Sequence, residues 1–258
     1  MDLTELRLLP LPRFRKALVS RFEMRLRASL PLRWRQRIAK GEQYLCPLCD
    51  NGVSGFRPYG IGKTDWCPVC QSMRRHRLLW LFLQSRSTLL KPQLRILHLA
   101  PEVGLSVRLR RIPGVFYLSC DPQASGVLLR SSAENLSLAS ASLDGIICNH
   151  VLEHVPDDLG AMREFFRVLR SNGWAVITVP LTGDPTEEEP NLADPKERER
   201  RFGQHDHVRH YGPDIKERLG MAGFKVEVIT GKTLADAEEL ERFGVGMETL
   251  LYFCVRPA

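Results

Sequence analysis

Four cysteines form two Cys-x-x-Cys pairs, Cys46-Pro-Leu-Cys49 and Cys67-Pro-Val-Cys70, with 17 residues between the pairs. Each pair can present two thiolates from one tight turn, and two pairs supply the four ligands of a tetrahedral zinc ion. A disulfide pairing is disfavoured because nothing in the sequence indicates an oxidising compartment. Four thiolates leave zinc no position for a water molecule, so we predict a structural Zn²⁺ site rather than a catalytic one.

A second group of candidate residues follows apolar runs that are typical of buried strands. The stretch RILHLAPEVG, residues 95–104, is typical of a strand, a tight turn and the start of a helix, and a second apolar run ends at Asp121. In open α/β sheets, ligands bind beyond the carboxyl ends of the strands, where a carboxylate can hold a ribose diol. By spacing alone, however, Asp121 is equally compatible with a simple turn.

The elements that must position these residues alternate between strand and helix from about residue 94, which predicts a mostly parallel sheet covered on both faces. We expect an α/β, doubly wound, Rossmann-like fold with seven strands, preceded by a small zinc knuckle. The helices are expected at 104–112, 157–170 and 213–222. The strands are expected at 94–100, 115–120, 126–130, 143–148, 174–179, 224–230 and 249–255.

Charge is concentrated at the N-terminus. Residues 1–40 hold eleven Lys and Arg against three acidic residues, whereas the whole chain of 258 residues carries +7, so the remainder is close to neutral. Leu11, Phe14, Leu18, Phe22 and Leu26 recur every three or four residues among the arginines, which predicts a basic amphipathic helix. We expect it to pack on the body with a solvated arginine face; contact with RNA phosphates or an anionic membrane is the alternative.

We therefore divide the chain into a basic arm (1–40), a zinc knuckle with a linking helix (41–90) and a main domain (91–258). No apolar run approaches the roughly 20 residues that span a bilayer, so we expect no transmembrane segment. The N-terminus also lacks the features of a secretory signal, and we expect a cytoplasmic protein. The sequence leaves the oligomeric state open.

Two stretches in the second half, LDGIICNHVLEHVPDD (143–158) and REFFRVLRSNGWAVITVP (163–180), resemble class I S-adenosylmethionine (SAM)-dependent methyltransferases of the type 11 kind. The resemblance covers about residues 94–258. The knuckle ending CPVCQSMRRHRLLWLFL, the loop LHLAPE and the later FGQHDHVRHYG resemble a bacterial subgroup with an N-terminal cysteine knuckle. The resemblance implies the class I methyltransferase fold, SAM as cofactor and methyl transfer as the reaction.

The loop after the first strand departs from the family pattern, which reads acidic-x-Gly-x-Gly-x-Gly. Here His98 takes the acidic position, Ala100 and Glu102 replace two glycines, and Gly104 alone is retained. The resemblance implies that these four residues contact the cofactor. Because His98 cannot supply the missing negative charge, we expect Glu102 to hold the ammonium group of the cofactor.

The family's other cofactor contacts map further along the chain. Asp121 corresponds to the acid that binds the ribose, and both of its oxygens are expected to accept hydroxyl protons. The backbone at Ala133 or Glu134 corresponds to the adenine contact. Asn149 follows the fourth core strand, where cofactor contacts also lie, whereas Glu153 is expected to cap or brace the following helix, together with His154.

The acceptor side of the site is expected to involve His150, which follows Asn149, and a lid over about residues 181–210. The lid ends in a cluster of histidines, Arg209 and Tyr211. We weigh three roles for this cluster: a metal site through His205-x-His207, a general base with Arg209 as an anion clamp, and a brace that locks the lid to the sheet. A brace or substrate contact is favoured over metal, and His150 and His207 are the catalytic candidates.

The favoured function is therefore a SAM-dependent methyltransferase acting on a small-molecule acceptor through an oxygen, sulfur or nitrogen nucleophile. No Asn-Pro-Pro-Tyr-like segment, which marks many amino-group methyltransferases, follows the fourth strand. The first alternative is an RNA methyltransferase in which the knuckle and the basic arm grip the phosphate backbone. The second is a noncatalytic zinc-bearing binding or assembly module.

Overall fold

The computed structural model describes residues 22–59 and 64–258. The first 21 residues of the predicted arm, with Leu11, Phe14 and Leu18, lie outside the described residues. Within the described part, residues 22–29 are helical, and α2 (Leu32–Ala39) follows. Phe22 and Leu26 are 69% and 56% exposed, so these apolar positions of the arm are not packed on the body as expected.

A six-stranded sheet forms the centre of the main domain, in the order β11-β12-β8-β7-β5-β6. Strands β6, β5, β7 and β8 run parallel, whereas β12 is antiparallel to β8 and β11 is antiparallel to β12. The bounds are β5 (Arg95–Leu99), β6 (Phe116–Cys120), β7 (Leu143–Asn149), β8 (Leu169–Thr178), β11 (Lys225–Thr230) and β12 (Leu250–Val255). The predicted fold class is confirmed.

The seventh strand, expected at 126–130, is the part of the fold prediction that is wrong. That segment pairs with β6 only through one bridge, between Leu129 and Cys120. The chain between Asp121 and Asp144 is too short for both a crossover helix and a full strand, and it forms turns instead.

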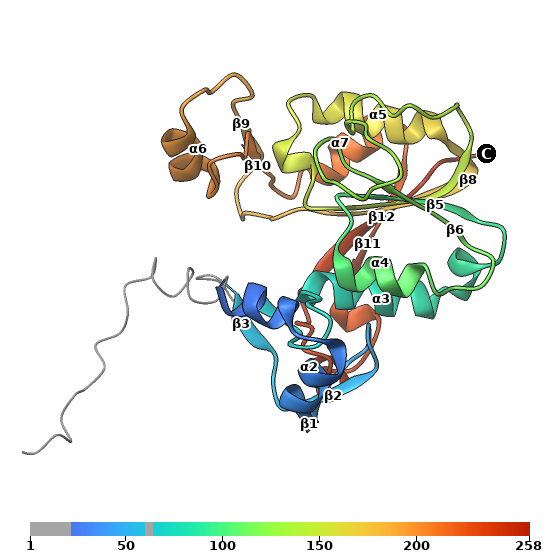
Figure 1. Cartoon of the computed structure of the whole chain (residues 1–258). Helices are drawn as coiled ribbons and strands as arrows, with labels where there is room; N and C mark the ends of the chain where they lie inside the picture. Colours follow the sequence, from blue (N-terminus) through green and yellow to red (C-terminus); the bar gives the residue numbers. More distant parts are fainter. Residues whose placement is uncertain (1–21, 60–63) are drawn as a thin grey trace, which may run out of the picture.

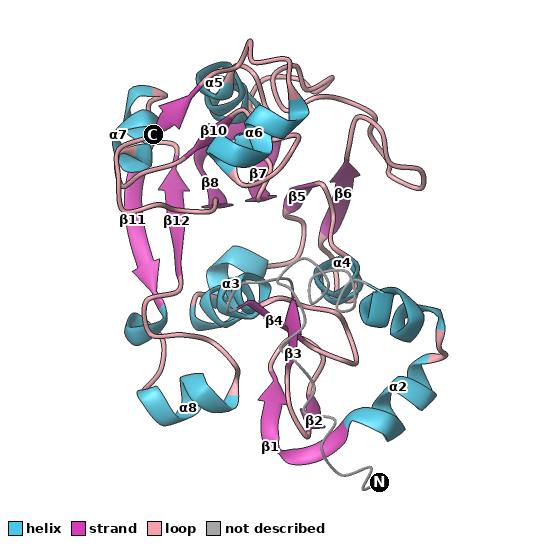
Figure 2. Cartoon of the chain, turned by 90° about the vertical axis from the view of Figure 1, so that its left-hand side faces the viewer, coloured by secondary structure: helices cyan, strands magenta, loops and turns pink. Residues whose placement is uncertain are grey.

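Helices cover both faces of the sheet (Figure 1). α5 (Asp158–Val168) and α7 (Ile215–Met221) lie on one face, and α3 (Arg74–Ser85) and α4 (Val103–Leu109) lie on the other (Figures 1 and 2). Successive strand residues point to opposite faces, so Ile146 joins the core under α5 and Ile147 joins the core under α3. α5 begins at Asp157, whose side chain accepts a hydrogen bond from the Gly160 amide at 2.8 Å.

The knuckle consists of two small hairpins, β1 (Lys40–Cys46) with β2 (Asn51–Val53) and β3 (Arg57–Tyr59) with β4 (Thr64–Trp66). Its apolar residues Leu48 and Val69 share one hydrophobic core with α3, α4 and the sheet. The guanidinium of Arg77 on α3 is fully buried and donates to the carbonyl oxygens of Ser72, at 2.8 Å, and Gly244, at 2.7 Å. The knuckle is thus packed into the main domain.

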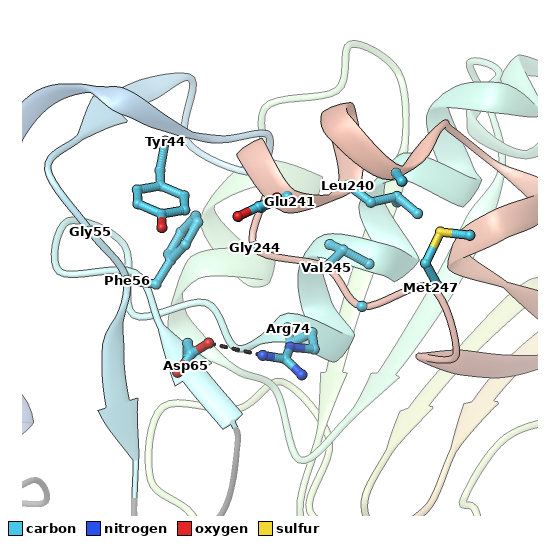
Figure 3. A pocket seen from close by; sticks show the side chains of 12 residues that line it. Tyr44, Gly55, Phe56, Asp65, Arg74, Leu240, Glu241, Gly244, Val245 and Met247 are labelled. Carbon is cyan, nitrogen blue, oxygen red and sulfur yellow. Dashed lines mark hydrogen bonds and ion pairs between the residues drawn. The ribbon is translucent and has the colours of Figure 1, made fainter.

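A cavity of about 410 Å³ remains where the knuckle meets α8 (Ala237–Arg242) and the loop after it (Figure 3). Tyr44 and Phe56 line it from the knuckle side, and Val245 and Met247 line it from the loop. An ion pair between Asp65 and Arg74, 2.9 Å long, crosses its edge.

The predicted lid contains regular structure: β9 (Glu187–Glu188), α6 (Pro195–Phe202) and β10 (Arg209–His210), with β9 and β10 paired antiparallel. Short 3-10 turns occur at Ser87–Leu90, Leu152–His154 and Gly231–Thr233. Among the residues that the structure describes, no helix combines the length and the apolar character that crossing a membrane requires.

Candidate active site

The four cysteines of the knuckle converge on one point. Their Sγ atoms all lie within 4.8 Å of one another, with Cys46 3.6 Å from Cys70 and Cys49 3.9 Å from Cys67. Zinc binds tetrahedral sets of four thiolates, and this donor set fits such an ion.

Gly104, the retained glycine of the expected cofactor loop, contacts the knuckle. A Cβ atom at this position would lie 2.7 Å from the carbonyl oxygen of Cys70 and 3.3 Å from a methyl carbon of Leu48. The glycine is therefore required for the close packing of α4 against the second Cys-x-x-Cys turn, and it does not line the cavity described next.

The cavity at the carboxyl ends of β5, β6 and β7 has a volume of about 520 Å³. It lies where ligands bind in doubly wound sheets. Three of the predicted cofactor residues line it, namely Ala100, Asp121 and Ala133, as does the predicted catalytic residue His150. The remaining lining residues are Leu99, Cys120, Pro122, Gln123, Ser131, Ser132, Glu134, Val151, His154, Val155, Pro156 and Asp206.

Asp121 at the end of β6 offers one free oxygen rather than two. Its Oδ1 accepts hydrogen bonds from the backbone amides of Gln123 and Ala124, at 2.8 and 2.7 Å, which fixes the turn after the strand. The expectation that both oxygens bind the ribose is therefore corrected: Oδ1 holds the turn, and only Oδ2 remains available to a ligand.

Two residues on the cavity wall adopt left-handed backbone conformations although neither is glycine. Ala100 has φ +44° and His150 has φ +51°, and each stands directly after the last residue of its strand, β5 or β7. Their amides are fixed by hydrogen bonds of 2.8 Å to the carbonyls of Cys120 and Thr178. Such conformations persist only where the surroundings enforce them, and they cluster at functional sites.

Glu102 lies away from this cavity, in a buried polar cluster between α3 and the sheet. Its oxygens are 2.8 Å from His76 Nε2 and 2.7 Å from His98 Nε2, and Asn149 Nδ2 lies 3.4 Å from Oε2. Burial alone would raise the pKa of Glu102, but the two imidazoles outweigh it and hold that pKa well below its usual range.

The predicted cofactor residues His98, Glu102 and Asn149 use their polar atoms within this cluster. His98 is fully buried, with Nδ1 3.0 Å from the hydroxyl of Tyr117, and Asn149 is buried and accepts a hydrogen bond from Thr178. None of the three residues lines the cavity. They lie at the junction between α3 and the sheet, and their contact with a cofactor stays a prediction.

The segment after β7 carries a second polar group. Glu153 is 1% exposed, and its Oε1 lies 3.2 Å from His150 Nδ1. His154, which was expected to brace the next helix, lines the cavity and packs edge-on against His207 at 4.6 Å between ring centroids. The helix cap is Asp157 instead, so Glu153 is left without the capping role predicted for it.

His207, the other catalytic candidate, is 3% exposed and lies behind His154 rather than on the cavity wall. Its Nδ1 is 2.9 Å from the carbonyl oxygen of Phe202 at the end of α6. Burial lowers the pKa of His207 below its ordinary value. His205, the other half of the His-x-His pair, is exposed.

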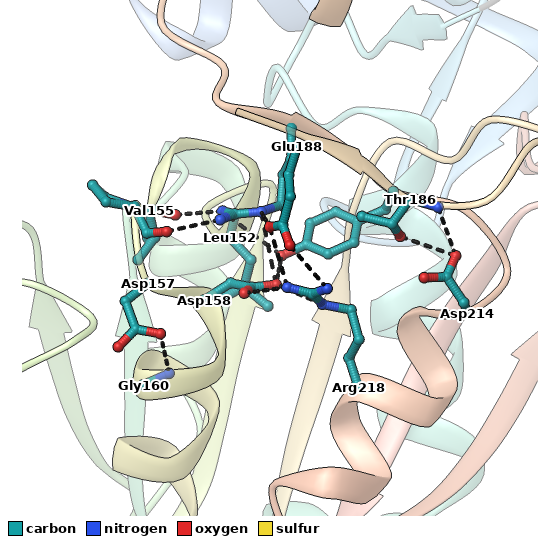
Figure 4. Close-up of polar contacts among 12 residues, drawn as sticks. Leu152, Val155, Asp157, Asp158, Gly160, Thr186, Glu188, Asp214 and Arg218 are labelled. Atoms are coloured by element: carbon teal, nitrogen blue, oxygen red, sulfur yellow. Dashed lines mark hydrogen bonds and ion pairs between the residues drawn. The ribbon is translucent and has the colours of Figure 1, made fainter. Parts of the chain in front are cut away.

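The lid is held to the main domain by a buried ionic network (Figure 4). Arg209 donates to the carbonyl oxygens of Leu152 and Pro156, at 2.8 Å each, and lies 3.0 Å from a Glu188 oxygen. Its guanidinium is only 1% exposed, so it braces the lid and is not free to clamp an anionic substrate.

The same network continues through Asp158 on α5, which accepts hydrogen bonds from Tyr211 at 2.6 Å and from Arg218 at 2.6 Å. Burial would raise the pKa of Asp158, but these donors outweigh burial and keep it below the ordinary value. Asp158 is the central residue that sequence reasoning missed. Its only signal was a second acid after the cap residue Asp157.

Comparison with known proteins gives one family match: the model described as "Methyltransferase domain" matches residues 118–177. This span runs from β6 through β8 and includes the cavity residues Asp121, Ala133 and His150. The match confirms the predicted enzyme class, a methyltransferase. A search of curated proteins finds no match.

Solved structures with a similar arrangement include a SAM-dependent methyltransferase from Archaeoglobus fulgidus, with 16% identity, a TM-score of 0.48, and coverage of 70% of this chain and 94% of that one. Another is the 1,6-didemethyltoxoflavin-N1-methyltransferase of Burkholderia thailandensis, with 16% identity, a TM-score of 0.49, and coverage of 71% and 79%.

Proposed function

We propose that this chain transfers a methyl group from SAM to a small-molecule acceptor through an oxygen, sulfur or nitrogen nucleophile. The observation that carries the proposal is the cavity of about 520 Å³ at the strand ends, with Asp121 and His150 on its wall. Small-molecule sites span about 300–1,000 Å³. Of the residues described before β5, none lines this cavity, so the knuckle adds no surface to it.

The lining residues fit SAM as the cofactor. Oδ2 of Asp121 is positioned to accept a hydrogen bond from a ribose hydroxyl, and the backbone at Ala133 and Glu134 borders the space for the adenine. When bound, SAM supplies an activated methyl group on a sulfonium, which is a good leaving group. A second cavity, of about 570 Å³, shares Ala100 and Asp121 with the first and extends the open surface at this edge of the sheet.

His150 is the residue that we propose to act on the acceptor. Because methyl transfer is an in-line displacement, the protein has to align donor and acceptor and to accept any proton that the acceptor loses. Glu153 at 3.2 Å from Nδ1 favours the tautomer with the proton on Nδ1, which leaves Nε2 as the proton acceptor. His207, which lies behind His154, would position this wall rather than touch the acceptor.

The cofactor assignment is tested by calorimetry with S-adenosylhomocysteine. Asp121→Asn retains an acceptor oxygen for the turn but replaces the free oxygen with a donor, and it should weaken binding by about 1.5–3 kcal/mol, or about 10- to 150-fold. Asp157→Asn makes the same chemical change at a helix cap outside the cavity and should leave affinity unchanged. Absence of binding by the unmodified protein would instead favour the noncatalytic module.

The acceptor is tested by screening small thiols, phenols and carboxylic acids in a homocysteine-release assay. For a thiol or phenol, turnover should rise with pH as the acceptor ionises. His150→Ala should reduce turnover while S-adenosylhomocysteine binding persists. Equal turnover by His150→Ala would remove this residue from the proposal without touching the cofactor assignment.

RNA is the second candidate acceptor, because α2 exposes Trp34 beside the arginines Arg33 and Arg37. Stacking on an aromatic ring and contacts to phosphates are the usual means of holding single-stranded RNA. On this reading, the logarithm of affinity should fall with the logarithm of salt by about 0.7 per neutralised phosphate. RNA would be the acceptor if the chain methylates RNA in a salt-sensitive manner and shows no turnover on the small-molecule panel. Arg33→Ala and Arg37→Ala should then abolish the RNA methylation.

A further inference from the structure

A cluster of metal-ligating side chains lies between the lid and the cavity, apart from the cysteines of the knuckle. Glu153, His154 and His207 each offer a ligand atom, and these atoms all lie within 4.8 Å of one another. Glu153 and His154 come from the 3-10 turn after β7, and His207 comes from the lid, about 50 residues later in the sequence. The three meet only in the folded protein.

Two members of the cluster are buried and carry a polar atom without a hydrogen-bond partner among the described residues. Glu153 is 1% exposed; its Oε1 lies 3.2 Å from His150 Nδ1, whereas its Oε2 has no such partner. His207 is 3% exposed, and its Nε2 likewise has no hydrogen-bond partner among the described residues. A buried polar atom without a partner costs about 1–3 kcal/mol, so a pair of them at one place requires an explanation.

The orientation of His207 suits a ligand. Its Nδ1 lies 2.9 Å from the carbonyl oxygen of Phe202, so the ring proton belongs on Nδ1 and the lone pair on Nε2. A ligating histidine in metal sites almost always donates its other ring N–H to such a carbonyl or carboxylate. On His154, Nδ1 lies 3.3 Å from Asp206 Oδ2, which gives the second imidazole an outer carboxylate partner as well.

We propose that Glu153, His154 and His207 form a site for a first-row divalent metal ion, distinct from the cysteine site. Two imidazoles and one carboxylate are a donor set of catalytic zinc and of non-haem iron sites, which keep open coordination positions. Metal–ligand distances of about 2.1 Å bring donor atoms to about 3–3.5 Å from one another. Donor atoms that lie within 4.8 Å of one another can therefore reach a single ion through small side-chain movements.

The position of the site indicates what the open coordination positions would face. His154 and Asp206 line the cavity, so an ion held there would stand at the cavity wall, beside His150. Resting on the proposed methyl transfer, this geometry favours acceptors that present an oxygen atom to the ion, such as phenols or carboxylic acids. The bound ion would also connect the lid, through His207, to the turn after β7.

The proposal is tested by dialysing the full chain to equilibrium against Zn²⁺ and measuring the bound zinc per chain by mass spectrometry. Calorimetry then measures the affinity for the second equivalent. We expect two equivalents, one at the cysteines and one here. Glu153→Gln and His207→Asn should each reduce affinity for the second equivalent more than about 100-fold, beyond the 10- to 100-fold cost of losing an outer partner. His205→Asn alters an exposed histidine of the same lid segment and should keep both equivalents.

Each other outcome overturns the proposal. One equivalent in the unmodified protein, or two equivalents in folded Glu153→Gln, excludes this ligand set; thermal melts of both variants show that they are folded. S-adenosylhomocysteine calorimetry on the same samples separates the two proposals. If the protein binds S-adenosylhomocysteine but no second zinc, the methyltransferase proposal stands and the metal-site proposal is wrong. If it binds a second zinc but no S-adenosylhomocysteine, the metal site stands and the methyltransferase proposal is wrong.

Discussion

Gly104 matches a glycine of the family's cofactor loop, but in this structure it is needed for packing against the knuckle. The resemblance placed it in a cofactor loop, but its missing side chain is what allows α4 to approach the Cys70 carbonyl. The cavity wall is formed instead by Ala100, which adopts the left-handed conformation that a glycine in that position would accept more readily. Gly104 thus occupies the position of a glycine in the family pattern, but in this structure it contacts the knuckle and does not line the cavity.

The role of Gly104 predicts a stability effect. Gly104→Ala places a Cβ atom 2.7 Å from a backbone oxygen, which cannot rotate away, so we expect a loss of about 1–3 kcal/mol in the free energy of unfolding. Gly55→Ala in the knuckle meets no atom within 4 Å and serves as the matched control. Denaturant unfolding measures both, and equal stability of the two variants would contradict the packing role.

At the scale of elements, the lid depends on Asp158. The carboxylate joins α5 to Tyr211 and to Arg218 on α7, and Arg209 completes the network from β10 (Figure 4). The lid is therefore a braced part of the domain rather than a loop that moves freely, since Arg209 near its end is buried with these partners.

Asp158→Asn should loosen this lid. Breaking a buried pair by removing one partner costs about 3–5 kcal/mol, because the other charges remain buried. We expect a lower melting temperature and faster hydrogen exchange over residues 181–210. Glu197→Gln breaks an exposed ion pair with Arg200 on α6 and should change neither measurement. Unaltered exchange in Asp158→Asn would show that the lid is held by other contacts.

The same carboxylate predicts a pH dependence. The pKa of Asp158 is lower in the folded protein than in the unfolded chain, so its contribution to stability is fully present above the unfolded value of about 4. It is lost as the pH falls through the lower folded value. The hydrogen-exchange protection factors of the lid, corrected for the intrinsic pH dependence of exchange, should fall below about pH 4 in the unmodified protein, and Asp158→Asn should remove that fall.

At the scale of the whole molecule, the knuckle and the sheet share one hydrophobic core, and Arg77 links Ser72 to Gly244 near the C-terminal strand. Loss of the predicted zinc from the knuckle should therefore destabilise the main domain as well. Cys46→Ser with Cys70→Ser should abolish zinc binding at the knuckle and lower the melting temperature of the whole chain. Cys254→Ala changes a buried thiol outside the cluster and should retain the metal. A separate, unchanged transition for the sheet would contradict this coupling.

The amino-acid sequence was enough to predict the alternation of strands and helices, the convergence of the four cysteines and the positions of Asp121 and His150 at strand ends. These features depend on local periodicity and short spacings, which can be read from neighbouring residues of the sequence. The linking helix and α5 follow from the same periodicity, whereas the cap of α5 is Asp157 and not the predicted Glu153 or His154.

The partners of Glu102, Gly104 and Asp158 could not be predicted in this way, because they are brought together by the folding of distant segments. Glu102 meets His76 from a helix that precedes the sheet, and Asp158 meets Arg218 about 60 residues later. The same holds for His207, which reaches His154 through the folding of the lid. Such contacts join residues that are far apart in the sequence, so no local pattern predicts them. A buried charge needs a partner, and the packing of the folded chain determines which residue lies close enough to pair with it.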